Sequence, residues 1–193
     1  MTDKLMEMRR AAYHEAGHAV INLMYGLPFK IVSLKTETEP SFQIEKGKRV
    51  TVLLTYTIGT VFSDERLYSL NKALMSGILD IKEALSLMGG AVAEIILLGK
   101  YDDQVRIGAR EDLQGIACCC RAAMSGSGKP EDWKEFPDME QSMITAITIG
   151  ANHLLKENWT CVEAIAEILM KKKELNYAEA SSIAEAKGLP QKG

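Results

Sequence analysis

The most informative segment of this 193-residue chain is Ala12-Tyr13-His14-Glu15-Ala16-Gly17-His18-Ala19. It lies within Lys4 to Tyr25, a region that contains no proline and is rich in alanine, the strongest helix former. Gly26 and then Pro28 follow this region, an order typical of the end of a helix. The sequence therefore predicts one long helix that carries the segment in its interior.

Two histidines and a glutamate in this segment form an HExxH pattern. His14 and His18 are one helical turn apart, with Cβ atoms about 5–6 Å apart, so one ring nitrogen of each can bind the same metal ion. Glu15 follows the first histidine and lies beside the metal, within reach of a water that the metal holds. The pattern predicts a zinc site in which His14 and His18 are ligands and Glu15 is the general base. The alternative is an ordinary amphipathic helix that carries histidines by chance.

Composition excludes several classes of partner. The hydrophobic content of 47%, the charged content of 25% and the net charge of −3 are ordinary for a globular protein, and they offer no attraction for nucleic acid or for an anionic membrane. The N-terminus is charged, and no stretch approaches the roughly 18 apolar residues of a membrane span. We therefore expect a cytoplasmic protein.

The four cysteines do not form a metal site in this interpretation. Cys118, Cys119 and Cys120 are consecutive within a predicted helix, where neighbouring side chains diverge, so they cannot chelate one ion together. We expect these three and Cys161 to be buried, reduced thiols.

Two strands are predicted after the first helix. Phe29 to Leu34 is one, and Arg49 to Ile58 is the other because apolar residues there alternate with threonines. The polar residues from Lys35 to Lys48 between them are predicted to form an exposed loop or a broken hairpin. The second strand could pair with an extended peptide.

The remaining chain is predicted to be mostly helical. Expected helices are Asn71 to Leu87, which pauses at Gly89-Gly90 and continues through Ala91 to Leu98, then Ala109 to Met124, Met139 to Asn158, Cys161 to Leu175 and Tyr177 to Lys187. Tyr101 to Gly108 is predicted to be a loop. The N-caps of the last three helices are predicted from capping-box spacing at Asp138, Thr160 and Asn176. We expect one domain over residues 1–193, mainly α (α+β), with a compact helical body and a small sheet after the first helix.

A catalytic zinc ion normally takes three protein ligands, so the site needs one more. Met24 stands where metzincins place their third histidine. His153 is the one remaining histidine of the three in the chain, and we expect it to be solvated or hydrogen-bonded on a C-terminal helix. Composition alone does not choose among the 26 acidic residues.

Three segments together resemble the ordered signatures of the zinc peptidase domain of the FtsH family. They are Ala12-Tyr13-His14-Glu15-Ala16-Gly17-His18-Ala19, Met88-Gly89-Gly90-Ala91-Val92-Ala93-Glu94-Ile95-Ile96 and Gly108-Ala109-Arg110-Glu111-Asp112-Leu113. Later segments, such as Ala151 to Asn158, are similar to the closing helices of that family, so the resemblance extends from about Met8 to Ile183. The chain departs from the family at Ala91, where an arginine is usual.

The resemblance implies that Asp112 is the third zinc ligand and that Glu94 lies beside the site and orients a ligating imidazole. The alternatives are that Asp112 is only a first-turn acid favoured by the helix dipole and that Glu94 is a solvated helix residue. Gly89 and Gly90 are then better explained as a point of close packing than as a phosphate-binding loop.

The resemblance also implies a zinc-dependent metalloendopeptidase that acts on flexible or unfolded polypeptides. FtsH proteins carry membrane helices and an ATPase ring ahead of this domain, and this sequence shows neither, so we expect that it does not unfold substrates with ATP by itself. Its expected partners are a peptide substrate, a separate ATPase or further copies of the chain. One alternative is a peptidase-derived binding or regulatory module with a structural or vestigial metal site, and another is a zinc hydrolase with a non-peptide substrate.

Overall fold

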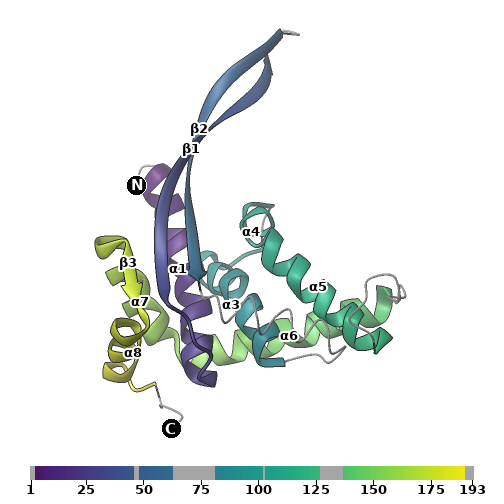
Figure 1. Ribbon diagram of the computed structural model, residues 1–193, viewed down its shortest axis with the longest axis vertical. Helices are drawn as coiled ribbons and strands as arrows, with labels where there is room; N and C mark the ends of the chain where they lie inside the picture. Colours follow the sequence, from purple (N-terminus) through teal and green to yellow (C-terminus); the bar gives the residue numbers. More distant parts are fainter. Residues whose placement is uncertain (1–2, 46–47, 63–80, 102, 127–136, 190–193) are drawn as a thin grey trace.

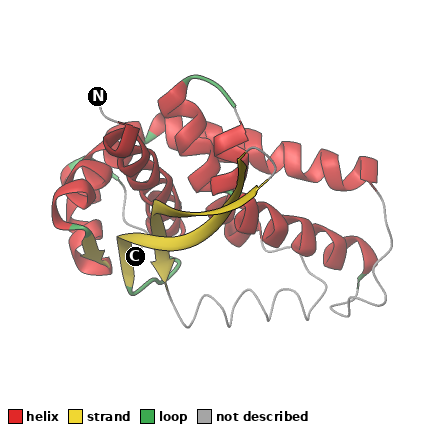
Figure 2. Ribbon diagram, turned by 90° about the horizontal axis from the view of Figure 1, so that it is seen from above, coloured by secondary structure: helices red, strands yellow, loops and turns green. Residues whose placement is uncertain are grey.

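The computed structural model describes residues 3–45, 48–62, 81–101, 103–126 and 137–189. In chain order the elements are α1 (Asp3–Tyr25), β1 (Ile31–Glu45), β2 (Lys48–Phe62), α3 (Ile81–Leu98), α4 (Asp103–Gly108), α5 (Arg110–Ser125), α6 (Pro137–Glu157), α7 (Trp159–Lys172), β3 (Glu174–Asn176) and α8 (Tyr177–Ala186). Helices make up most of the described chain, and the strands form one small sheet (Figures 1 and 2). The predicted mainly α fold with a small sheet is confirmed.

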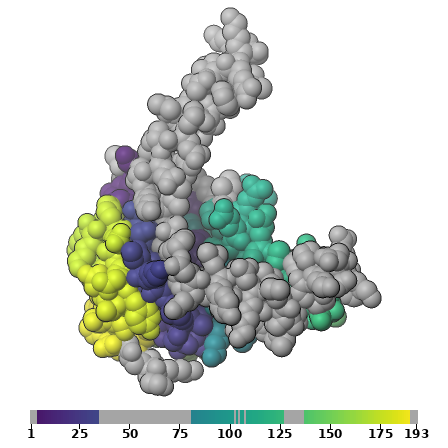
Figure 3. Space-filling model, in the orientation of Figure 1, coloured from purple at the N-terminus to yellow at the C-terminus, as the bar shows by residue number. Residues whose placement is uncertain are grey.

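Helix α1 is the centre of the packing, because α3, α6, α7 and the sheet all contact it. The buried side of α1 carries Ala12, Ala16 and Ala19, none of which is exposed to solvent. Such small side chains allow neighbouring helices to approach closely. The C-terminal helices pack beside the N-terminal segment on the face that Figure 3 shows.

The backbones of helices α1 and α3 come into close contact at Gly17 and Gly89. A Cβ atom added to Gly17 would lie 2.3 Å from the carbonyl oxygen of Gly89, a distance that no real side chain tolerates. The predicted pause at Gly89-Gly90 is wrong, because α3 runs through both residues without a break. The predicted role of the glycine pair as a point of close packing is confirmed.

The sheet has the strand order β2-β1-β3, and all its pairing is antiparallel. Strands β1 and β2 pair residue by residue from Ile31↔Phe62 to Glu45↔Lys48 and extend together away from the helices (Figure 1). The prediction of an exposed loop or a broken hairpin is therefore wrong from Lys35 to Glu45 and at Lys48, and even Pro40 lies within β1. A proline is tolerated there because, within the described residues, β1 pairs on only one side beyond Leu34.

Strand β3 corrects a second prediction. Helix α7 ends at Lys172, and Lys173 takes a left-handed conformation with φ of 68°, so the chain leaves the helix before Leu175. The next three residues pair with Ile31 to Ser33 of β1. Leu175 is the buried residue of this strand, and its exposed neighbours complete an alternation too short to be recognised in the sequence.

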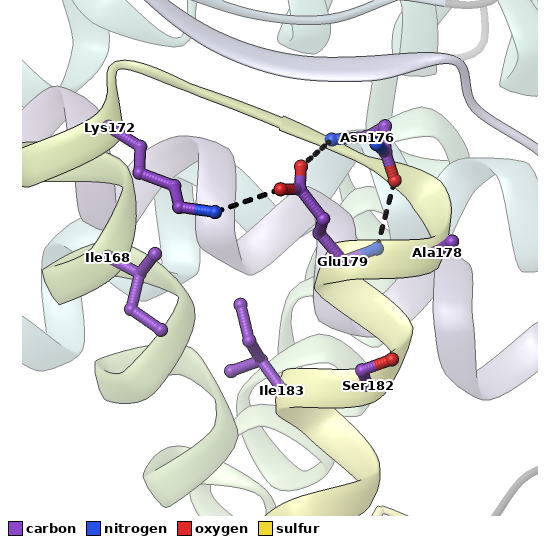
Figure 4. Close-up of a pocket in the computed structure, with 7 residues that line it drawn as sticks. All are labelled: Ile168, Lys172, Asn176, Ala178, Glu179, Ser182 and Ile183. Atoms are coloured by element: carbon purple, nitrogen blue, oxygen red, sulfur yellow. Dashed lines mark hydrogen bonds and ion pairs between the residues drawn. The ribbon is translucent and has the colours of Figure 1, made fainter.

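Several helix boundaries also differ from the predictions. The predicted loop from Tyr101 to Gly108 contains α4, a helix too short to show a hydrophobic period. Helix α7 begins after Asn158 instead of Thr160, and α6 begins at Pro137, so Asp138 is inside the helix. The predicted capping box at Asn176 is confirmed (Figure 4). The backbone N–H of Glu179 donates to the Asn176 side chain, and the backbone N–H of Asn176 donates to the Glu179 side chain. Residues 71–80 of the helix predicted from Asn71 to Leu87 lie outside the described residues.

The four cysteines lie on α5 and α7. Cys119, Cys120 and Cys161 are buried and unbridged, as expected, whereas Cys118 is partly exposed. Burial and then the charge of Glu140 raise the pKa of the Cys120 thiol to about 11.

Within the described residues, no helix combines the length and the apolar character needed to cross a membrane. Cytoplasmic location stays a prediction.

Candidate metal centre

One face of α1 carries a row of polar side chains spaced four residues apart, the spacing that aligns residues along a helix. The row consists of Arg10, His14, His18 and Asn22. It meets α3, where Glu94 and Ser86 supply the partners of all four side chains. These polar groups are buried or nearly buried, so the interface between α1 and α3 is polar along this row although the rest of it is apolar.

Hydrogen bonds to α3 determine which nitrogen of each imidazole is available to bind a metal ion. His18 Nδ1 donates to the backbone carbonyl of Ser86 at 2.6 Å, and a carbonyl oxygen can only accept. His14 Nδ1 donates to Glu94 Oε1 at 2.8 Å. Each neutral ring therefore carries its hydrogen on Nδ1 and presents a lone pair at Nε2.

The two Nε2 atoms converge with one carboxylate oxygen. They are 3.0 Å from each other, and Asp112 Oδ2 lies 3.2 Å from His14 Nε2 and 3.3 Å from His18 Nε2. Three electron-rich atoms at such distances repel one another unless a cation lies between them. Ligands at about 2.0–2.1 Å from a tetrahedral zinc ion are about 3.3 Å apart, so this group of atoms has the spacing that such an ion requires.

The electrostatics of the site favour the same conclusion. Burial lowers the pKa of His14, but hydrogen bonds to Asp112 and Glu94 and the charge of Glu15 outweigh it and raise that pKa to about 10. Burial raises the pKa of Asp112, yet the nearby imidazoles hold that pKa well below its ordinary value. The surroundings of the two residues thus stabilise one positive charge between them, which a proton or a metal ion can supply.

Gly90 of α3 leaves the space in front of the imidazoles open. A Cβ atom at this position would lie 2.4 Å from His14 Nε2 and 2.5 Å from His18 Nε2. Any other residue would place carbon against the two lone pairs. The glycine therefore serves the site as well as the packing of α1 on α3.

Glu15 also lies at this centre. It is 5% exposed, and one of its carboxylate oxygens is within 4.8 Å of a ring nitrogen of both histidines. That distance suits either a ligand or a proton acceptor. Asp112 Oδ2 lies 3.2 and 3.3 Å from the two Nε2 atoms and reaches them from the first turn of α5.

The third histidine is elsewhere. His153 is on α6, its side chain is 70% exposed, and its Nε2 lies 3.3 Å from Glu157 Oε1 one turn later. This agrees with the prediction of a solvated or hydrogen-bonded histidine. The structure thus brings together His14, Glu15, His18, Glu94 and Asp112, and it leaves His153 outside.

Sequence reasoning missed three participants. The first is Arg10, which donates to Glu94, and the second is Ser86, whose backbone carbonyl accepts from His18. The third is Gly90, where an added Cβ atom would contact both imidazoles. Arg10 had a usable signal, since it precedes His14 by one helical turn. Ser86 had none, because it contributes a backbone carbonyl.

A separate shallow hollow lies between α7 and α8 (Figure 4). It is lined by Ile168, Lys172, Asn176, Ala178, Glu179, Ser182 and Ile183. Lys172 and Glu179 form an ion pair of 2.9 Å across it. None of the residues of the metal centre lines this hollow, so it is not part of the same site.

The amino-acid sequence is similar to those of known zinc metalloproteases. Two ATP-dependent zinc metalloproteases of Phytoplasma mali (strain AT), FtsH 3 and FtsH 1, are each 26% identical to the chain over 92% of its length and 28% of theirs. The chain is thus similar to FtsH zinc metalloproteases over most of its length. The FtsH resemblance inferred from the sequence motifs is thereby confirmed.

The FtsH relationship covers the chain but only part of its relatives. The ATP-dependent zinc metalloprotease FTSH 9, chloroplastic/mitochondrial, of Oryza sativa subsp. japonica is also 26% identical, over 93% of the chain and 22% of its own length. The chain thus spans about a quarter of the length of these curated relatives. No protein-family model matches it.

Proposed function

We propose that the chain is a zinc-dependent metalloendopeptidase, folded over residues 1–193 as a single FtsH-like peptidase domain. His14 Nε2, His18 Nε2 and Asp112 Oδ2 would hold the zinc ion. The observation that carries this proposal is the convergence of these three atoms to within 3.3 Å of one another, with both Nδ1 atoms already committed to other acceptors.

Zinc, when bound, acts as a Lewis acid on the scissile carbonyl and makes water a nucleophile at neutral pH. Glu15 is the general base: its carboxylate takes a proton from the attacking water and returns it to the leaving amine. The burial of Glu15 keeps bulk water away from this carboxylate. Glu94 keeps the hydrogen of His14 on Nδ1, so that Nε2 remains available to the metal.

The proposed substrates are flexible peptides or unfolded segments of proteins. Among the described residues, strand β2 is an edge strand of the sheet, and it packs near α1, so an extended peptide could pair with this edge close to the helix that carries Glu15. The relatives are named as ATP-dependent enzymes, and the chain corresponds to about a quarter of their length. We therefore propose that folded substrates require an ATPase, or an ATPase part, that this segment does not contain.

Glu15→Gln tests the mechanism. The amide keeps the shape of the side chain but cannot accept the proton, so the variant should bind zinc as the wild-type protein does while peptide cleavage falls by about 10²–10⁴-fold. Cleavage is measured by mass spectrometry of a peptide library incubated with the zinc-loaded protein, with and without a chelator.

Glu157→Gln is the matched control, because it removes a carboxylate that is exposed on α6 beside His153. It should cleave as the wild-type protein does. Undiminished cleavage by Glu15→Gln would show that the base is wrong. Tight zinc binding without any cleavage by the wild-type protein would favour a binding or regulatory module instead.

A further inference from the structure

Arg10 reaches the metal centre through Glu94. Its Nε and Nη2 atoms both donate to Glu94 Oε2, at 3.0 and 2.8 Å, and its side chain is only 11% exposed. The other oxygen of the same carboxylate, Oε1, accepts from His14 Nδ1 at 2.8 Å. A continuous chain of charge-assisted hydrogen bonds therefore runs from Arg10 through Glu94 to His14.

The two oxygens of Glu94 have different partners. The planar edge of a guanidinium group fixes a carboxylate in orientation as well as in charge, because its two donors approach from one direction. With Oε2 held by Arg10, Oε1 is aimed at the His14 ring. Glu94 has a side-chain exposure of 5%, so without Arg10 its charge would be buried with one principal partner fewer.

The other imidazole does not depend on this chain of contacts. His18 Nδ1 is held by the backbone carbonyl of Ser86, which is part of α3 and does not rotate. The two proposed histidine ligands thus have different supports, one made of side chains and one of backbone. This difference provides an internal control within the site.

We propose that Arg10 is a positioning residue of the metal centre: by clamping Glu94 it directs the His14 ring and keeps Nε2 of His14 facing His18 and Asp112. The inference depends on the proposed zinc site. The hydrogen bonds from Arg10 to Glu94 connect it to the site, so its effect is on metal affinity through the orientation of one imidazole.

The test compares Arg10→Met with Arg9→Met in the full chain. Both variants remove one positive charge from adjacent positions, but the Arg9 guanidinium lies over the Tyr13 ring, 5.5 Å from its centroid, and not on Glu94. Zinc affinity is measured by competition with a chromophoric chelator. In the zinc-loaded protein, NMR measures how fast the Nδ1 hydrogens of His14 and His18 exchange with water.

Arg10→Met should weaken zinc binding about tenfold, the lower end of what is typical when an outer partner of a metal ligand is removed. It should also speed exchange of the His14 Nδ1 hydrogen while that of His18 is unchanged, and Arg9→Met should alter neither. Arg10→Lys keeps the charge but loses the planar pair of donors, so it should lie between the two. If Arg10→Met does not fold, Arg10→Lys is compared with Arg9→Met in its place.

Two results would overturn the role of Arg10 without affecting the metal site. One is that Arg10→Met and Arg10→Lys bind zinc with the same affinity as Arg9→Met. The other is that hydrogen exchange speeds up equally at both histidines, which would indicate that the packing of the whole site has loosened. Failure of the wild-type protein to bind zinc would overturn the metal site itself.

Discussion

Gly90 determines how closely the backbone of α3 approaches the two imidazoles of α1. Gly90→Ala should weaken zinc binding by tenfold or more, because the added Cβ would lie 2.4 and 2.5 Å from the two Nε2 atoms unless the helices or the rings move. The distance between imidazoles that the metal requires would then be lost. Zinc affinity is measured by chelator competition.

Gly150→Ala is the control for this substitution. Gly150 lies on α6, and within 4 Å its added Cβ would meet, among the described residues, only a side-chain atom of Leu85 of α3, at 3.1 Å, and none of the proposed ligands. It should leave zinc affinity unchanged. If Gly90→Ala binds zinc as tightly as the wild-type protein, the ion does not lie where these residues converge.

The residues of the site differ in how far the sequence predicted them. His14, Glu15 and His18 followed from helical spacing and known metal chemistry. Asp112 was inferred only from the family resemblance, since it is 98 residues from His14 and nothing local marks it among the acidic residues. Arg10 and Glu94 form their ion pair across 84 residues, and such a pairing depends on how α1 and α3 pack.

At the level of elements, α1 and α3 pack with their backbones in close contact. Gly17→Ala should lower the free energy of unfolding by about 1–3 kcal/mol, the usual range for overpacking, because the new Cβ would meet the Gly89 carbonyl oxygen at 2.3 Å. A backbone atom cannot move aside as a flexible side chain does. Urea unfolding at equilibrium measures the change.

Gly115→Ala provides the comparison on α5. Among the described residues its Cβ would meet only a terminal atom of Leu87, at 3.3 Å, and alanine favours the helix by up to about 1 kcal/mol relative to glycine. Stability should therefore stay the same or rise. Equal effects of the two substitutions would mean that the backbones of α1 and α3 are not in close contact.

The elements also show where sequence patterns stop being informative. Helix α1 was predicted almost to the residue because alanine content, the absence of proline and a glycine stop all agree. The outer part of β1 was missed because it is polar and contains Pro40, and its extended form depends on pairing with β2. Strand β3 and helix α4 are too short for periodicity to identify.

At the scale of the whole molecule, the proposed zinc ion would join α1 to α5, with α3 supporting the ligands of α1. A ligand that binds only the folded state stabilises it by about 2.7 kcal/mol at a concentration 100 times its dissociation constant. For a chain of this size, zinc should therefore raise Tm by roughly 5–10 °C over the chelated protein. Calorimetry with and without chelator measures this shift.

Asp112→Ala is the control, because it removes the one proposed ligand that α5 contributes. Its Tm should respond to zinc much less than that of the wild-type protein. A wild-type Tm that is the same with zinc and with chelator would mean that no ion joins these helices.

The most direct measurement is an anomalous difference map from crystals grown with zinc, with data collected on both sides of the zinc absorption edge. We predict one strong peak within about 2.2 Å of His14 Nε2, His18 Nε2 and an Asp112 oxygen, with Glu15 beside the ion but not bound to it. Absence of a peak between the two imidazoles, or a peak coordinated by Glu15 in place of Asp112, would contradict the account.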